Sequence, residues 1–142
     1  MMSLNTYLYF DGNCAKVFDF YKLVFGCEFT ARMCFSDAPP DLNFKECDND
    51  RIMHMSLPVG ESVLMGSDVP SDEDEPPKSN NSFAVSYSAK TREETDTIYA
   101  ALKADGGAET MPLQDTFWGS YFGMCKDKFG VHWMVSCDLG KD

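Results

Sequence analysis

One order of sequence patterns occurs twice along the 142 residues, and this internal repeat limits the possible folds more than any other feature. Residues 5–10 and 82–89 are short stretches rich in β-branched and aromatic side chains, which is typical of strands. A helical pattern follows each of them, and three further strand-like stretches follow each helix. Because a repeated sequence pattern folds into a repeated structural unit, we predict an α+β fold of two βαβββ half-repeats that form curved sheets around a cleft.

The first half-repeat contains a predicted helix and a predicted hairpin. Apolar residues recur at three- and four-residue steps over residues 13–25, which indicates a helix with one buried face. Asp11 or Asn13 can cap its start, and Gly26 fits its left-handed end. The remaining segments are a strand at 27–35, a loop at 36–50 that contains Pro39 and Pro40, and hairpin strands at 51–57 and 62–67.

An acidic segment with three prolines, residues 68–81, separates the two halves and is interpreted as a linker. We therefore divide a single domain of residues 1–142 into half-repeats of about 1–67 and 82–142. In the second half, Thr91 and Glu94 predict a capping box at the start of a helix that Gly106 and Gly107 close. Three strands follow at 108–114, 118–126 and 131–137, with a turn at 127–130.

The formal net charge of −11 argues against two classes of partner, nucleic acids and anionic membranes, because both attract basic surfaces. We expect no membrane association, since no apolar run approaches the roughly 20 residues of a membrane span. The first residues do not resemble a secretion signal, and the six cysteines form no C-x-x-C pair. These features favour a cytoplasmic protein whose cysteines are reduced and mostly buried.

Three stretches together resemble a known family: "YLYFDGNCAKVFDFYKLVFG", "IMHMSLPVGESVLMGSD" and "WGSYFGMCKDKFGVHWMV". They are similar to the PhnB-like branch of the vicinal oxygen chelate superfamily, which includes glyoxalase I, bleomycin-resistance proteins and extradiol dioxygenases. The similarity extends from about residue 5 to residue 137, and the aromatic run at 118–133 is its most specific part. Members of this branch have carried a methyltransferase label, but the chain has no glycine-rich strand-to-helix loop for a nucleotide-type cofactor.

Enzymes of this superfamily hold a divalent metal through the first and last strands of each half, usually with His, Gln or Glu. The resemblance places Thr6, Met65, Ser82 and Met134 at those positions. Thioethers and hydroxyls suit such a cation poorly, and a shift of one residue along any of the four strands brings in no better ligand. We therefore predict no metal ligands at these positions and no cofactor.

Strand alternation predicts which side chains line the cleft. If Met134 faces the cleft, His132 faces it too, and Trp133 packs beneath a helix. The same reasoning places Thr6 and Leu8 inward and Tyr7 and Tyr9 against the helix. The predicted ligand-binding residues are Thr6, Leu8, His54, Met65, Ser67, Ser86, Trp118, Phe122, His132 and Met134.

Such a wall suits a small apolar or aromatic molecule, although the same residues can simply fill a core. The first hypothesis is therefore a metal-free protein that binds or sequesters a small molecule, and it leans away from enzymatic activity. One alternative is a metal-dependent lyase, isomerase or dioxygenase with a site relocated to His54 or His132. Another is a purely structural or interaction module, with a collapsed core and no pocket. The resemblance also implies a homodimer. No catalytic residue is assigned, because neither histidine has an evident nucleophile or carboxylate partner in the sequence. The groups that could act with a histidine are the thiols of Cys125 and Cys137 and the carboxylates of Glu46, Asp68 and Asp127.

Overall fold

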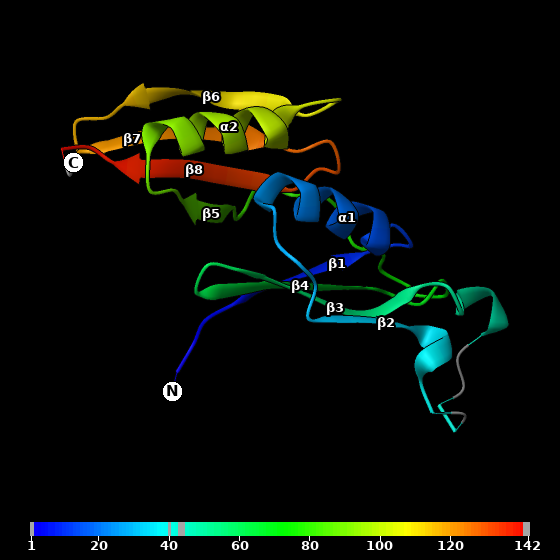
Figure 1. Cartoon of the computed structure of the whole chain (residues 1–142). Coiled ribbons are helices and arrows are strands. Elements are labelled where there is room, and N and C mark those ends of the chain that lie inside the picture. The colour runs from blue at the N-terminus through cyan, green and yellow to red at the C-terminus, as the bar shows by residue number, and fades with distance from the viewer. Residues whose placement is uncertain (1, 40, 43–44, 141–142) are drawn as a thin grey trace. The chain divides into compact units, whose positions relative to one another are not determined.

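The computed structural model describes residues 2–39, 41–42 and 45–140, and it divides into two compact units. The first unit is Met1–Lys78 and the second is Ser79–Asp142, so the boundary lies within the segment interpreted as a linker. The elements of the first unit are β1 (Thr6–Phe10), α1 (Cys14–Phe25), β2 (Ala31–Cys34), β3 (Ile52–Val59) and β4 (Ser62–Asp68). Those of the second are β5 (Val85–Ser88), α2 (Arg92–Lys103), β6 (Ala108–Asp115), β7 (Ser120–Lys126) and β8 (His132–Asp138) (Figure 1).

Both units contain a mixed four-stranded sheet with the same topology. The strand order is β1-β4-β3-β2 in the first unit and β5-β8-β7-β6 in the second. In each unit the first and last strands pair in parallel and the other pairs are antiparallel. The helix connects the first strand to the second and covers one face of its own sheet. The predicted fold of two βαβββ repeats is therefore confirmed, while the cleft stays a prediction.

In the first unit, α1 packs against β3 and β4 through aromatic side chains. Phe18 is fully buried and meets Phe10 edge to face, with ring centroids 6.3 Å apart. Gly66 of β4 allows this close approach, because a Cβ there would lie 2.6 Å from the Phe18 ring. Gly26 ends α1 with a φ of 64°, as its position in the sequence predicts.

The start of α1 is held from a distance rather than by the predicted local cap. Asn13 occupies the N-cap position but makes no side-chain cap hydrogen bond. Instead, the buried carboxylate of Asp68, at the end of β4, accepts hydrogen bonds from the backbone N–H groups of Gly12 and Cys14. Its second oxygen accepts from the backbone of Ile52, so one side chain joins β4, the helix start and β3.

The start of α2 is capped locally, as predicted. Thr91 accepts a hydrogen bond from the backbone N–H of Glu94 at 3.0 Å. The Glu94 carboxylate accepts from the backbone of Lys90 and from the Tyr87 hydroxyl, and this arrangement lowers the pKa of Glu94. In a full capping box, the Glu94 carboxylate would accept from the backbone N–H of Thr91. Here it accepts from the backbone N–H of Lys90 instead. Beneath α2, Gly123 of β7 leaves space for the Tyr99 ring and for the side chain of Leu113 on β6.

Several segments differ from the sequence-based expectations. The strand expected at 27–35 is confined to β2, and the loop at 36–50 contains 3₁₀ turns at Phe35–Asp37 and Glu46–Asp48. Pro40 and residues 43–44 of that loop lie outside the described residues. The beginning of the expected linker is bonded to the first unit, since Val69 donates to the Phe10 carbonyl and its own carbonyl accepts from Arg51.

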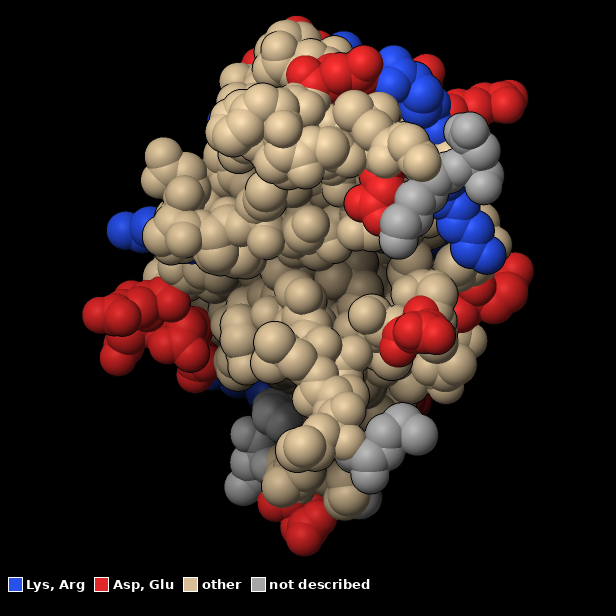
Figure 2. Space-filling model, turned by 90° about the vertical axis from the view of Figure 1, so that its left-hand side faces the viewer, with Lys and Arg blue, Asp and Glu red and all other residues tan. Residues whose placement is uncertain are grey.

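None of the helices within the described residues combines the length and apolarity needed to cross a membrane. Acidic side chains project at several separate places on the surface seen in Figure 2, and much of the surface between them is uncharged. That distribution agrees with the formal net charge of −11.

Candidate functional site

Each sheet has one face under its helix and one face opposite the helix, which we call its open face. In the first unit, Leu8 and Phe10 lie on the helix side, because both are buried and Phe10 contacts α1. Tyr7 and Tyr9 alternate with them, and their exposed fractions are 37% and 60%. The predicted orientation of this strand is therefore wrong. Two tyrosine hydroxyls under a helix would need polar partners, whereas Leu8 and Phe10 gain from burial there.

Thr6 and Leu8 consequently do not belong to the open face, although both were among the predicted ligand-binding residues. Thr6 pairs in register with Leu64 and Leu8 pairs with Gly66, and both partners lie on the helix side. The other candidates of this unit do lie on the open face: Met65 pairs with Tyr7, and Ser67 pairs with Tyr9. His54 lies on β3 with the same orientation as Ser56, which is the register partner of Met65.

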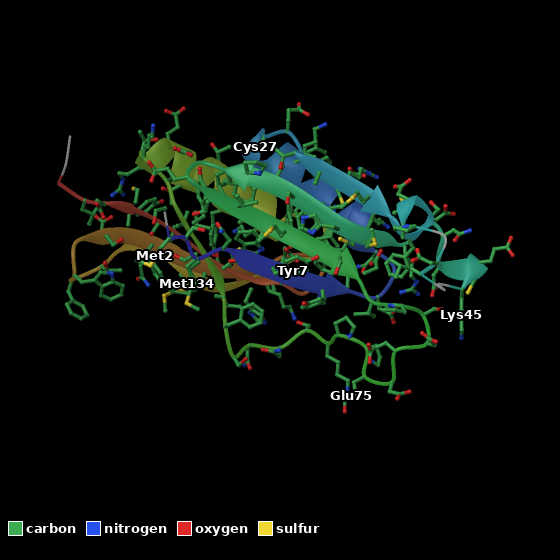
Figure 3. All side chains as sticks on the ribbon, turned by 90° about the horizontal axis from the view of Figure 1, so that it is seen from below. Met2, Tyr7, Cys27, Lys45, Glu75 and Met134 are labelled. Carbon is green, nitrogen blue, oxygen red and sulfur yellow. The ribbon has the colours of Figure 1, made fainter. Side chains whose placement is uncertain are left out.

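A chain of hydrogen bonds crosses the open face of the first sheet. The Tyr7 hydroxyl lies 3.1 Å from Nδ1 of His54, and Nε2 of His54 lies 3.0 Å from the Ser56 hydroxyl. The rings of Tyr7 and His54 are stacked at a centroid distance of 5.7 Å, and the ring of Tyr9 lies 5.2 Å from that of Tyr7. We call Tyr7, His54 and Ser56 the tyrosine–histidine–serine chain. Figure 3 shows Tyr7 on β1, on the face of the sheet turned away from α1.

The second sheet places the predicted candidates of its unit on a single open face. Ser86 pairs in register with Met134, and His132 and Met134 alternate with the buried Trp133 and Val135. Phe122 pairs with Ser136 on the same face. The ring of Trp118, with an exposed fraction of 58%, meets that of Phe122 edge to face at 5.8 Å. Sequence alternation therefore predicted this face correctly, while ligand binding by it stays a prediction.

The neighbours of Trp133 confirm that it packs beneath a helix. Its exposed fraction is 2%, and its indole N–H donates to the buried carboxylate of Asp127. The other oxygen of Asp127 accepts from the backbone of Phe129 and Val131, which holds the predicted 127–130 turn. His132, by contrast, makes no side-chain hydrogen bond to any described residue and lies half-buried beside Lys126.

The pairing of the first and last strands in each unit locates the open-face positions at which the resemblance expects metal ligands. Tyr7 pairs with Met65 between the first and last strands of the first unit, and Ser86 pairs with Met134 in the second. Ser82 lies outside the strands, four residues before the equivalent position.

A phenol, a hydroxyl and two thioethers are a poor ligand set for a divalent cation. The described residues also contain no group of three His, Cys, Asp or Glu side chains placed to hold a metal. The donor groups at these positions therefore do not fit the metal of the related enzymes.

Of the thiols and carboxylates considered as partners for the histidines, four are buried, namely Cys125, Cys137, Asp68 and Asp127, and Glu46 is exposed. Burial raises the pKa of Cys125 to about 11, so this thiol stays protonated near neutral pH and is a weak nucleophile. Cys137 is buried on the helix side of β8. Both oxygens of Asp68 and of Asp127 accept hydrogen bonds, as described above, and Glu46 lies in an exposed 3₁₀ turn.

The sequence-based reasoning missed the pairing of His54 with Ser56 and Tyr7. The two residues of the motif "HMS" share a face because they are two apart on β3, and that signal was present in the sequence. Tyr7 was misplaced because the wrong face of β1 was assigned to the helix.

Comparison with known proteins agrees with this architecture. The chain is 29% identical to protein YjdN of Escherichia coli over 144 residues, which covers 95% of both chains. It is 34% identical to protein PA1353 of Pseudomonas aeruginosa, whose crystal structure superposes with a TM-score of 0.85 over 98% of this chain and 99% of that one.

A PhnB protein of Bacillus cereus, described as a putative 3-demethylubiquinone-9 3-methyltransferase, is 23% identical, with a TM-score of 0.72. It covers 98% of this chain and 100% of its own, and at this identity it supports the fold alone. The profile of the Glyoxalase/Bleomycin resistance protein/Dioxygenase superfamily matches residues 3–135. The chain therefore belongs to the Glyoxalase/Bleomycin resistance protein/Dioxygenase superfamily.

Proposed function

We propose that this protein binds a small aromatic or apolar molecule without a metal ion, on the open face of the first sheet. The observation that carries the proposal is the row of adjacent rings formed by Tyr9, Tyr7 and His54, with Met65 beside Tyr7 in the strand register. Aromatic faces and thioethers attract flat apolar molecules, and a few polar groups among them orient the ligand.

The polar groups of this face support binding rather than metal coordination. A metal-bound imidazole needs one ring nitrogen free for the cation, but both nitrogens of His54 have hydrogen-bond partners. The acidic surface also favours a neutral or cationic ligand over an anion. A neutral aromatic molecule satisfies both conditions.

The second open face supplies a further set of groups for the same class of ligand. Trp118 and Phe122 provide rings, and Met134 provides a thioether, in the equivalent of the Met65 position. Trp118 also gives this face an optical signal, because the second tryptophan of the chain is buried under α2. Quenching of the exposed indole would therefore report contact of a ligand with this second face.

A single sheet face contacts a ligand on one side, whereas small-molecule sites bury most of the ligand surface. We propose that a second copy of the chain completes the enclosure in a homodimer. Light scattering after size-exclusion chromatography should then report twice the 15.9 kDa of one chain. A mass of one chain would contradict this part of the proposal.

Titration with the neutral fluorescent probe N-phenyl-1-naphthylamine, in buffer with EDTA, tests the binding function. We expect saturable binding that Met65→Ala weakens by about fivefold or more, since the lost thioether contact is worth roughly 1 kcal/mol or more. The matched control is Leu23→Ala, which removes an exposed apolar side chain of α1, away from the open face. Absence of saturable binding, or equal weakening by both variants, would contradict the proposal.

A further inference from the structure

We infer, on the basis of the proposed function, that Tyr7 presents its hydroxyl hydrogen to the ligand and that the ligand carries a neutral carbonyl or similar acceptor oxygen. The inference follows from the direction of the two hydrogen bonds that join Tyr7, His54 and Ser56. Both bonds can run in either of two directions, because imidazole has two tautomers. The surroundings of Ser56 decide between them.

Ser56 is the buried end of the chain, with an exposed fraction of 8%. Among the described residues, His54 Nε2 is the one partner of its hydroxyl. If Nε2 carried the proton, the Ser56 oxygen would accept it, and the hydroxyl hydrogen of Ser56 would have no acceptor in the described part of the chain. A buried donor without an acceptor costs about 1–3 kcal/mol. The Ser56 hydroxyl therefore donates to Nε2.

This choice fixes the rest of the chain. When Nε2 of neutral His54 accepts a hydrogen bond, the proton of the ring lies on Nδ1. Nδ1–H then donates to the Tyr7 oxygen, 3.1 Å away. The hydroxyl hydrogen of Tyr7 then has no acceptor among the described residues. Since 37% of the Tyr7 surface is exposed, that hydrogen points to a place where a ligand or water can accept it.

The chemical class of the ligand follows from this free donor. An acceptor oxygen on an aromatic molecule can bond to Tyr7 while its ring packs on Tyr9 and Met65. A carboxylate would also accept the bond, but the formal charge of −11 disfavours an anion. A neutral carbonyl group meets both requirements. Ser56 and His54 act as positioning residues, because they direct the Tyr7 hydrogen outward without touching the ligand.

The tautomer of neutral His54 is measured directly by the nitrogen chemical shifts of its ring. We expect the proton on Nδ1 in the wild-type protein, and a shift of the tautomer population toward Nε2 in Ser56→Ala. Ser67→Ala is the matched control, since it removes another buried serine hydroxyl of the same face that does not bond to His54. A proton on Nε2 in the wild type would overturn the inference whatever the ligand experiments give.

Two probes test the ligand class: the naphthyl ketone Prodan, and N,N-dimethyl-2-naphthylamine, which has the same rings without the ketone. Tyr7→Phe should weaken Prodan binding about 3- to 10-fold, as expected for one net hydrogen bond, and leave the amine unchanged. Leu23→Ala is the control, because this exposed side chain of α1 lies away from the open face. Binding of both probes with no selective effect of Tyr7→Phe would overturn the inference and leave the proposed function standing. Binding of neither probe would overturn both.

Discussion

The open face of the first sheet joins an imidazole to two hydroxyls, whereas the open face of the second leaves its imidazole without a described partner. In the first unit, His54 is bonded at both ring nitrogens. In the second, His132 lies at the start of β8 beside Lys126, on the same face as Met134. The strand order and the directions of strand pairing are the same in both, so the scaffold does not impose these side chains. The repeat provides two equivalent surfaces, and their chemistry has diverged.

The helix starts differ in a similar way. The start of α1 depends on Asp68, which is more than fifty residues away along the chain, while the start of α2 depends on Thr91 immediately before it. A cap supplied from another strand couples the helix to the sheet, whereas a local cap stabilises the helix alone. The predictions below test this difference, beginning with the largest expected effect.

Replacement of Asp68 by Ala should lower the free energy of unfolding by about 3 kcal/mol or more, because three backbone N–H groups lose their acceptor in a buried site. Urea denaturation measures the change. Asp50→Ala, at an exposed position of the same unit, is the control and should change stability little. A loss below about 1 kcal/mol for Asp68→Ala would show that the helix start does not depend on β4.

Alkaline pH should destabilise the protein through its buried thiols. The pKa of Cys125 is raised from 9.0 to about 11, so folding favours the protonated thiol. This contribution is fully present below pH 9 and is lost as the pH rises toward about 11. For Cys125 it amounts to roughly 2–3 kcal/mol. Burial also raises the pKa of Cys14 in the first unit, which adds an effect of the same sign.

The Cys125→Ala variant tests this prediction through the pH dependence of its unfolding free energy. The slope between pH 9 and about 11 should be smaller than in the wild type, although the absolute stability also falls because a buried side chain shrinks. Cys47→Ala, which removes an exposed thiol, should leave the slope unchanged. Parallel curves for Cys125→Ala and the wild type would contradict the prediction.

Replacing the glycine that faces each helix should destabilise both units, by about 1–3 kcal/mol each. The added Cβ of Gly66→Ala would lie 2.6 Å from the stiff Phe18 ring and 3.0 Å from the Leu8 carbonyl oxygen. That of Gly123→Ala would lie 2.8 Å from the flexible Leu113 side chain and 3.0 Å from the Tyr99 ring. Gly66→Ala should therefore cost more, and Phe18→Leu should partly relieve it in a double mutant. Thermal denaturation of Gly66→Ala, Gly123→Ala, Phe18→Leu and the double mutant, each compared with the wild type, measures these costs. Equal costs of the two glycine substitutions, or no relief in the double mutant, would contradict this packing.

The smallest effect concerns the local caps. Thr91→Ala should cost about 1 kcal/mol, because the Glu94 N–H loses its acceptor at the start of α2. Asn13→Ala should lower the free energy of unfolding by only about 0.3 kcal/mol, since Asn13 makes no cap hydrogen bond on α1. Urea denaturation compares the two variants. Similar losses at both positions would remove the distinction between a local and a remote cap.

The repeated fold was predictable because its signals are local. Apolar periodicity predicted α1, and the Gly26 end and the Thr91 cap are short sequence signatures. The alternation of His132, Trp133 and Met134 also assigned their faces correctly, because a tryptophan beside valines marks the buried side of a strand.

The errors concern interactions between distant segments. The predicted orientation of β1 was wrong because both of its faces carry large side chains, Tyr7 and Tyr9 on one and Leu8 and Phe10 on the other. The packing of Phe10 against Phe18 shows which face lies under α1, and that contact joins two different elements. The role of Asp68 was invisible for the same reason, since its three donors come from two other segments. The bond between Tyr7 and His54 also joins residues 47 positions apart.

The central claim is that the open face of the first sheet binds an aromatic molecule without a metal. The most direct test is the dissociation constant of N-phenyl-1-naphthylamine, measured in EDTA and again with one equivalent of Zn²⁺, Mn²⁺, Ni²⁺ or Fe²⁺. The account predicts the same dissociation constant in all conditions. Binding that appears only with a metal, and that His54→Ala or His132→Ala abolishes, would contradict it and favour a metal-dependent enzyme with a relocated site.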